Sequence, residues 1–134
     1  MSKNVEIVQS YFSALSIGDF DTVISLLSDD LIWHQPGKGK QSGTYKGKEE
    51  VLVHLGNFAK WSSGTFAIDQ VEYISENGQF VAASINFKAT KDNKSISMKG
   101  VDLLLIQDEK IKEVWLFSER IEEEDDFWEI ASSH

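Results

Sequence analysis

The second half of the chain consists of four strand-like runs that are separated by short polar turns. Successive side chains in such runs point to opposite faces of a strand. Sequences typical of turns, Glu76-Asn77-Gly78 and Asp108-Glu109, connect two of the neighbouring pairs. The runs cover residues 65–75, 79–90, 95–107 and 110–121. Four consecutive strands joined by such turns predict an antiparallel sheet, and this restricts the fold to architectures built on one.

Helical spacing dominates the first half of the chain. Apolar residues recur every three or four positions within residues 5–15, and Gly18 can close this helix. Asp19 is a suitable N-cap for a second, short helix. A short strand over 31–35 and a glycine-rich loop lead to a third helix over 48–58. Helices followed by a strand meander predict an α+β fold.

Composition narrows the functional classes. With 134 residues and 41% hydrophobic content, the chain fits one domain spanning residues 1–134. The net charge of −9 disfavours binding to nucleic acid or to an anionic membrane surface. The N-terminus lacks the apolar run of a signal peptide and there is no cysteine, so we expect a cytoplasmic protein. Five consecutive acids, 122–126, are expected to form a solvated edge.

Asp102 is a carboxylate at a position where the strand pattern calls for an aliphatic residue. It shares one face of the run 95–107 with apolar neighbours, because side chains on a strand alternate with a period of two. A buried acid must be hydrogen-bonded, ion-paired or protonated, and acids with shifted pKa values concentrate in functional clefts. Two interpretations stay open: a functional acid, or a structural acid paired with Lys99, Lys112 or Arg120.

The opposite face of the same run is also apolar. It carries Val101, Leu103 and Leu105. Since the helices can cover only one face of the sheet, the other face is expected to meet a second subunit, most simply in a homodimer.

Several stretches make the chain similar to a known superfamily. They are IVQSYFSALSIGDFD, LLSDDLIWHQPG, SGTYKGKEEVL, GVDLLLIQDEKIKEVWLF and the C-terminal DDFW. Together they resemble the nuclear transport factor two-like superfamily, in its SnoaL-like and ketosteroid-isomerase-like branch. The resemblance implies a cone-shaped curved antiparallel β-sheet with three N-terminal helices packed on its concave face, enclosing a pocket.

The resemblance also implies a site. In ketosteroid isomerases a tyrosine of the first helix and a protonated aspartic acid donate hydrogen bonds to the substrate oxyanion. Tyr11 and Asp102 match those positions. The general base of the family corresponds to Gln35, which cannot accept a proton at neutral pH. His34 is the neighbouring alternative, although strand alternation places it on the other face.

Aromatic side chains are the other expected component of a small-molecule pocket, because such pockets are mainly apolar with few polar groups. Most aromatic residues of any chain are simply core, and Trp33 and Trp115 are the preferred wall residues. The complete predicted set is Phe12, Trp33, Phe58, Trp61, Phe87, Trp115 and Phe117. The histidines are too dispersed to predict a metal site, and no cofactor is expected.

Two functions of different class remain. One is an enzyme that binds a small apolar, carbonyl-bearing molecule and catalyses an isomerisation, a cyclisation or a related proton transfer. In it Tyr11 and Asp102 would stabilise an enol or enolate oxygen. The other is a non-catalytic dimeric module that binds a ligand or helps a partner assemble.

Overall fold

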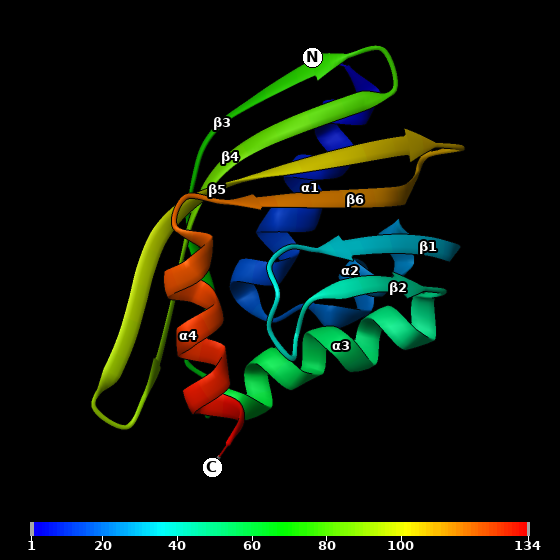
Figure 1. Ribbon diagram of the computed structural model, residues 1–134. Helices are drawn as coiled ribbons and strands as arrows, with labels where there is room; N and C mark the ends of the chain where they lie inside the picture. Colours follow the sequence, from blue (N-terminus) through cyan, green and yellow to red (C-terminus); the bar gives the residue numbers. More distant parts are fainter. Residues whose placement is uncertain (1, 134) are drawn as a thin grey trace.

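The computed structural model describes residues 2–133 and shows one six-stranded, curved, unclosed sheet with helices packed on it (Figure 1). The helices are α1 (Lys3–Ile17), α2 (Phe20–Leu26), α3 (Lys48–Trp61) and α4 (Ile121–Ser132). The strands are β1 (Leu27–Gln35), β2 (Gly43–Lys46), β3 (Ala67–Asn77), β4 (Phe80–Lys91), β5 (Lys94–Gln107) and β6 (Lys110–Ser118). The α+β class, the curved sheet and the four-strand meander are confirmed.

The strand order is β2-β1-β6-β5-β4-β3. Every neighbouring pair is antiparallel except β1 and β6, which run parallel. The predicted four-strand meander is antiparallel as expected, and β1 joins it in the parallel direction. A hairpin fixes the relative direction of two strands, but β1 reaches β6 only through long-range packing, so its direction is not set by a turn.

The first two helices begin and end where the sequence predicts. The Ser2 hydroxyl accepts a hydrogen bond from the Val5 amide at 3.1 Å and caps α1. Gly18 closes the same helix with a φ of 73°, a left-handed conformation that glycine adopts without a side-chain clash. The Asp19 carboxylate then accepts from the Thr22 amide at 3.2 Å and caps α2. These caps turn the chain sharply between the helices.

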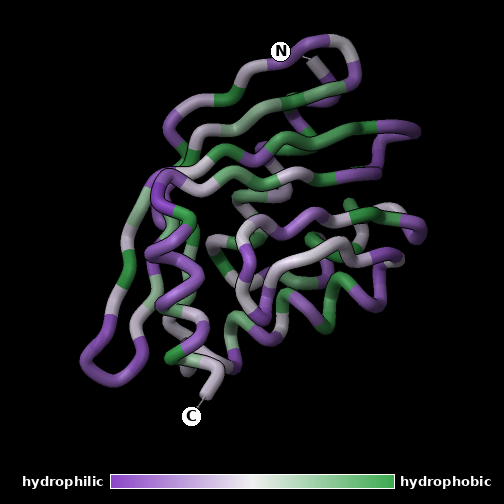
Figure 2. The backbone as a smooth tube through the Cα atoms, viewed as in Figure 1, coloured by the Kyte–Doolittle hydropathy of each residue, from purple (hydrophilic) through white to green (hydrophobic). Residues whose placement is uncertain are grey.

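The face of the sheet that the helices cover contains the main core. Along β5 the buried residues are every second one from Ile96 to Ile106, with Asp102 among them. Hydrophobic residues recur along the central strands, whereas the hairpin tips are hydrophilic (Figure 2). No helix within residues 2–133 combines the length and the apolar character that crossing a membrane requires.

The acidic run is helical, and the solvated edge that the sequence suggests holds for Glu122, Glu123 and Asp126, which are exposed, but not for the buried Glu124. Strand β6 ends at Ser118, three residues earlier than expected, and α4 begins at Ile121. Its first turn carries Glu122, Glu123 and Glu124, where carboxylates interact favourably with the positive end of the helix dipole. A fourth helix therefore joins the three that were predicted. It lies beside the first half of β5, towards the hairpin with β4 (Figure 1).

The glycine-rich loop also contains structure that its composition does not indicate. Residues Gly43–Lys46 form β2, which pairs with the end of β1. The preceding loop is fastened to α4, because Asp125 accepts hydrogen bonds from the Lys38 amide at 2.9 Å and the Gln41 side chain at 2.8 Å. The segment that follows Gln35 is thus held against the C-terminal helix.

Candidate functional site

Asp102 lies on the covered face of β5, in the middle of the sheet. Its residue is 6% exposed, and burial raises the pKa of its carboxyl from 3.8 to about 7. Two of its neighbours on the same face are small, because Ala83 of β4 pairs with it and Gly100 precedes it by two residues, whereas Leu116 and Leu104 lie on its other sides. At neutral pH a substantial fraction of this carboxyl is protonated and can donate a hydrogen bond.

The structural alternative, in which Asp102 pairs with a cation, is wrong. Lys99 bonds to Glu72, and Lys112 bonds to Asp30 at 2.7 Å. Arg120 bonds to Glu119 and to Glu123. All three cations are engaged elsewhere, on the exposed side of the molecule. Among the described residues no cation neutralises Asp102, which is why its pKa rises rather than falls.

Tyr11 of α1 lies near this acid on the covered side of the sheet. It is 3% exposed, and its pKa is raised above the ordinary value, first by burial and second by the negative charge of Asp102. The two residues are 91 positions apart in sequence, so only the packing of α1 against the sheet brings them together. The phenol stays protonated at any physiological pH and is a permanent donor.

Neither group makes a hydrogen bond to another described residue, and neither is sealed from water. Within residues 2–133, Gln41 Oε1 is the only side-chain oxygen or nitrogen of the buried or half-buried residues that is inaccessible to solvent and has no hydrogen-bond partner. The Tyr11 hydroxyl and the Asp102 carboxyl, which have no partner in that range, therefore retain contact with space that water can reach.

Gln35, at the predicted base position, also lies on the covered face. It is 8% exposed, and its side-chain oxygen lies 2.9 Å from Trp33 Nε1 and 3.0 Å from His54 Nε2. Strands β1 and β6 run parallel and are in register at His34 and Trp115, so the next residues, Gln35 and Leu116, also lie side by side. On its other side Leu116 pairs with Asp102 of β5. Gln35 and Asp102 thus lie on either side of Leu116, across three adjacent strands.

His34 lies on the opposite face of the sheet from Gln35. Its Nε2 is 2.6 Å from Glu113 Oε2, its Nδ1 is 3.2 Å from Thr44 Oγ1, and its ring stacks on Trp115 at 5.4 Å. No bulge rotates the end of β1, so ordinary strand alternation directs this imidazole away from Tyr11 and Asp102. The structure does not bring His34 into the candidate site.

Two of the predicted pocket aromatics lie on that outer face as well. Trp115 stacks on His34, and Phe117 is 58% exposed. Both alternate with inward-facing Val114 and Leu116 along β6. Their assignment to a pocket wall is corrected, because the sequence pattern of β6 is apolar on both faces and does not show which one the helices cover.

The other predicted aromatics lie on the covered side. Phe12, Trp33, Phe58 and Phe87 are buried, and Trp61 is half-buried against the core. Phe58 is central to a group of rings that includes Trp61, Phe66 and the fully buried Trp128. These rings contact one another and fill the end of the covered face nearest α4.

Two buried ionisable residues were missed by sequence reasoning. His54, which the pattern suggests is half of a solvated pair with Glu50, is 2% exposed and contacts Gln35 instead. Glu124, within the acidic run, is 4% exposed and accepts hydrogen bonds from Ser118 and from Trp128 Nε1 at 3.1 Å. Its spacing of four from Trp128 on a helix was the available signal. Within residues 2–133 no three His, Asp or Glu side chains are placed to hold a metal ion.

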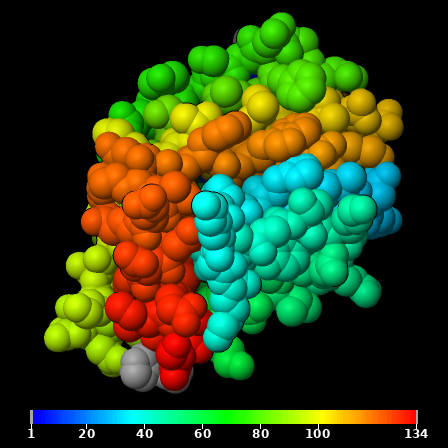
Figure 3. Space-filling view, in the orientation of Figure 1, coloured from blue at the N-terminus to red at the C-terminus, as the bar shows by residue number. Residues whose placement is uncertain are grey.

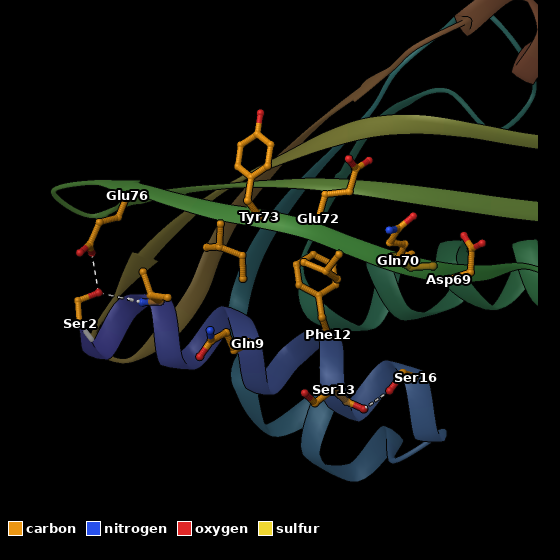
Figure 4. Close-up of a pocket in the computed structure, with 14 residues that line it drawn as sticks. Ser2, Gln9, Phe12, Ser13, Ser16, Asp69, Gln70, Glu72, Tyr73 and Glu76 are labelled. Carbon is orange, nitrogen blue, oxygen red and sulfur yellow. Dashed lines mark hydrogen bonds between the residues drawn. The ribbon is translucent and has the colours of Figure 1, made fainter.

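A separate groove of about 870 Å³ lies between α1 and the edge strand β3 (Figure 4). It is open to the outside, and Phe12 is the one predicted pocket residue that lines it. Phe12 points from the helix towards the strand, whereas Tyr73 points away from the helix (Figure 4). Tyr11, Gln35 and Asp102 do not line this groove, so it is distinct from the candidate site.

Comparisons with known proteins bear on the family and the fold. The model of the SnoaL-like domain family matches residues 8–114. A crystal structure of a protein of unknown function with a cystatin-like fold from Xanthomonas campestris is 41% identical, with a TM-score of 0.90, and covers 93% of this chain and 97% of its own. The structure of TerC co-crystallized with polyporic acid is 17% identical, with a TM-score of 0.81 over 96% of this chain and 99% of its own.

A curated relative, an uncharacterized protein of Mycobacterium tuberculosis, is 22% identical over 93% of this chain and 95% of its own length. The chain belongs to the SnoaL-like domain family, within the nuclear transport factor two-like superfamily. That membership accounts for the curved sheet, and it leaves the site and its ligand to be argued from the residues themselves.

Proposed function

We propose that this protein binds a small, largely apolar molecule through a carbonyl or enol(ate) oxygen, in a cavity on the covered face of the sheet. Tyr11 and Asp102 donate hydrogen bonds to that oxygen, and Phe12, Trp33, Phe58, Trp61 and Phe87 supply the apolar walls. One observation carries the proposal. Two buried donors lie near each other, and neither has a partner among residues 2–133 although both touch water-accessible space.

The physical argument concerns unmet hydrogen-bonding capacity. A buried hydroxyl and a buried acid without protein partners are unfavourable unless water or a ligand bonds to them. An oxygen that gains negative charge, as in an enolate, accepts stronger hydrogen bonds than a neutral carbonyl. The pair therefore favours an enol or enolate, and preorganised donors of this kind are usually a large part of catalysis in a dry site.

Proton abstraction by a side chain has weaker support. Gln35 is not a base, and burial lowers the pKa of His54 to about 4, so its imidazole is a poor proton acceptor. The amide at position 35 favours the second candidate, a non-catalytic ligand-binding module. The fold itself is compatible with both, since TerC was co-crystallized with polyporic acid and another neighbour is described as a putative SnoaL-like polyketide cyclase.

Titration with 2-naphthol, an aromatic mimic of an enol, tests the site. We expect saturable binding to the wild type. Tyr11→Phe and Asp102→Ala should each weaken binding about tenfold or more, because each removes one buried donor to a partly charged oxygen. Naphthol fluorescence reports both the affinity and the ionisation of the bound phenol.

Matched control variants distinguish a loss of these hydrogen bonds from a general loss of folding. Tyr73→Phe removes a hydroxyl from a side chain in the exposed part of β3, and Asp126→Asn neutralises an exposed acid of α4. Neither should change the affinity. Circular dichroism establishes that each variant is folded. Equal binding by the wild type and the two site variants would contradict the proposal.

We further propose that the uncovered face of the sheet mediates a homodimer. Its apolar residues are contiguous across paired strands, since Phe80 pairs with Leu105, Val101 with Phe117 and Leu103 with Trp115. Phe117, Phe80 and Val101 are 58%, 41% and 38% exposed. Strands β5, β6 and β1 occupy much of the face seen in Figure 3. An apolar patch of this kind on a sheet supports a protein contact.

Sedimentation at micromolar concentration should give twice the chain mass of 15.1 kDa. Phe117→Lys places a charge in the centre of the proposed interface and should shift the protein to monomer, because a buried unpaired charge disfavours association. Phe20→Lys, at a 61% exposed phenylalanine of α2, is the matched control and should remain dimeric. A monomeric wild type would refute the interface.

A further inference from the structure

The amide of Gln35 is held in one orientation by two neighbours. Trp33 Nε1 lies 2.9 Å and His54 Nε2 lies 3.0 Å from the same side-chain atom. An indole nitrogen can only donate, so the Gln35 atom that it contacts must be the amide oxygen. The His54 nitrogen facing that oxygen must also carry a hydrogen. The oxygen of Gln35 accepts both hydrogen bonds, and its NH₂ group points elsewhere.

His54 is itself fixed and neutral. Its ring stacks on Tyr45 with centroids 3.8 Å apart and meets the edge of Phe58 at 4.9 Å. Burial lowers its pKa to about 4, so it carries no charge at neutral pH. The Nε2–H tautomer that Gln35 requires therefore persists across the physiological range.

The NH₂ group of Gln35 has no acceptor among residues 2–133, and it is not one of the sealed atoms. Its residue lies on the covered face beside Leu116, and Asp102 lies on the other side of Leu116. Two strand spacings separate the backbones of Gln35 and Asp102, a distance on the order of 10 Å. The covered face thus presents a second, neutral donor at a distance from the Tyr11 and Asp102 pair.

We infer that Gln35 Nε2 is a specificity-determining donor that recognises a second acceptor oxygen of the ligand. The class of ligand that fits is a flat, apolar molecule of about two fused rings with an oxygen acceptor near each end, such as a hydroxyaryl ketone or an extended dicarbonyl. Trp33 and His54 are positioning residues, since they act through the Gln35 oxygen. This inference rests on the proposed function of the same site.

A pair of probes tests the inference. The first is 2-naphthol, which offers one oxygen, and the second is 6-acetyl-2-naphthol, which adds a carbonyl acceptor at the far end. The acetyl group also changes the acidity of the hydroxyl, so the measured quantity is the ratio of the two affinities in the wild type compared with that ratio in each variant. The loss of one hydrogen bond corresponds to a change of roughly five- to tenfold in affinity, and therefore in this ratio.

Gln35→Glu keeps an oxygen that accepts from Trp33 and His54 but has no NH₂ group, and Gln35→Met cannot donate in any protonation state. Both variants should lose the five- to tenfold preference for the acetyl probe while still binding 2-naphthol through Tyr11 and Asp102. Trp33→Phe keeps an aromatic ring but removes one of the two donors that hold the Gln35 oxygen, and it should reduce the same ratio. The carbonyl stretch of the bound acetyl probe should lie at lower wavenumber in the wild type than in Gln35→Met.

The outcomes are distinguishable. Binding of 2-naphthol that depends on Tyr11, with an affinity ratio and a carbonyl stretch unchanged by Gln35→Met, would overturn this inference alone. Failure of the wild type to bind 2-naphthol would overturn the proposed function and this inference with it. Loss of the ratio in Gln35→Met, with 2-naphthol binding retained, supports both.

Discussion

Asp102→Asn is expected to stabilise the protein at pH 8 by about 4 kcal/mol and to leave its stability at pH 4 nearly unchanged. Burial raises the carboxyl pKa from 3.8 to about 7 in the folded state. Between these values the unfolded chain releases the proton while the folded protein retains it. Folding therefore becomes less favourable by about 1.4 kcal/mol for each pH unit in that interval, and the loss levels off above pH 7. Asparagine has a similar shape and does not titrate, so it removes this dependence.

Urea denaturation of the wild type and the variant at pH 4, 6 and 8 measures the effect. The difference in unfolding free energy should grow with pH and then become constant. Asp126→Asn, at an exposed position on α4, should give the same small difference at all three values. A difference that does not change between pH 4 and pH 8 would mean that folding does not raise the pKa of the Asp102 carboxyl, which contradicts the buried, unpaired acid described above.

Trp128→Ala is expected to destabilise the protein by about 4 kcal/mol, a large part of the stability of an ordinary domain. Trp128 is fully buried and its ring contacts Phe58, Trp61, Phe66 and Phe127. Its removal leaves a cavity where α4 meets α3 and the sheet. The same change removes the indole donor to Glu124.

Trp128→Phe separates the two contributions, because it keeps most of the ring volume and loses the donor. We expect a loss of about 1–3 kcal/mol from the buried Glu124 carboxyl that is then less well bonded. Thermal and urea unfolding measure both variants, with Phe20→Ala, at a 61% exposed ring of α2 outside the proposed interface, as the smaller reference change. A Trp128→Ala variant within 1 kcal/mol of the wild type would show that α4 is not an integral part of the fold.

Much of the architecture follows from local sequence patterns. Alternation along residues 95–107 places Asp102 on a buried face, and the structure confirms it. Gly18 and Asp19 end one helix and begin the next, as their conformational and hydrogen-bonding preferences predict. The same alternation correctly separates His34 from Gln35. These features depend on residues that are close in sequence, so the sequence reveals them.

Other features depend on contacts between distant segments. The pattern of β6 is apolar on both faces, so it could not show that Trp115 and Phe117 face outward. The acidic run 122–126 is polar by composition, yet Trp128 and Ser118 bury Glu124 within it. His54 carries no signal of its own, because its partner Gln35 lies on a strand 19 residues away.

The sequence by itself determined three of the four helices, five of the six strands, the buried face of β5 and the presence on it of an acid where an aliphatic residue would be expected. The tertiary structure alone decided what shares the covered face with that acid: a phenol from α1 near it, the Gln35 amide of β1 beyond Leu116, and no cation paired with it among the described residues. The physical reason is that periodicity and capping act within a few residues. Hydrogen-bond partners and pKa values depend instead on burial and distance between segments that are far apart in the chain.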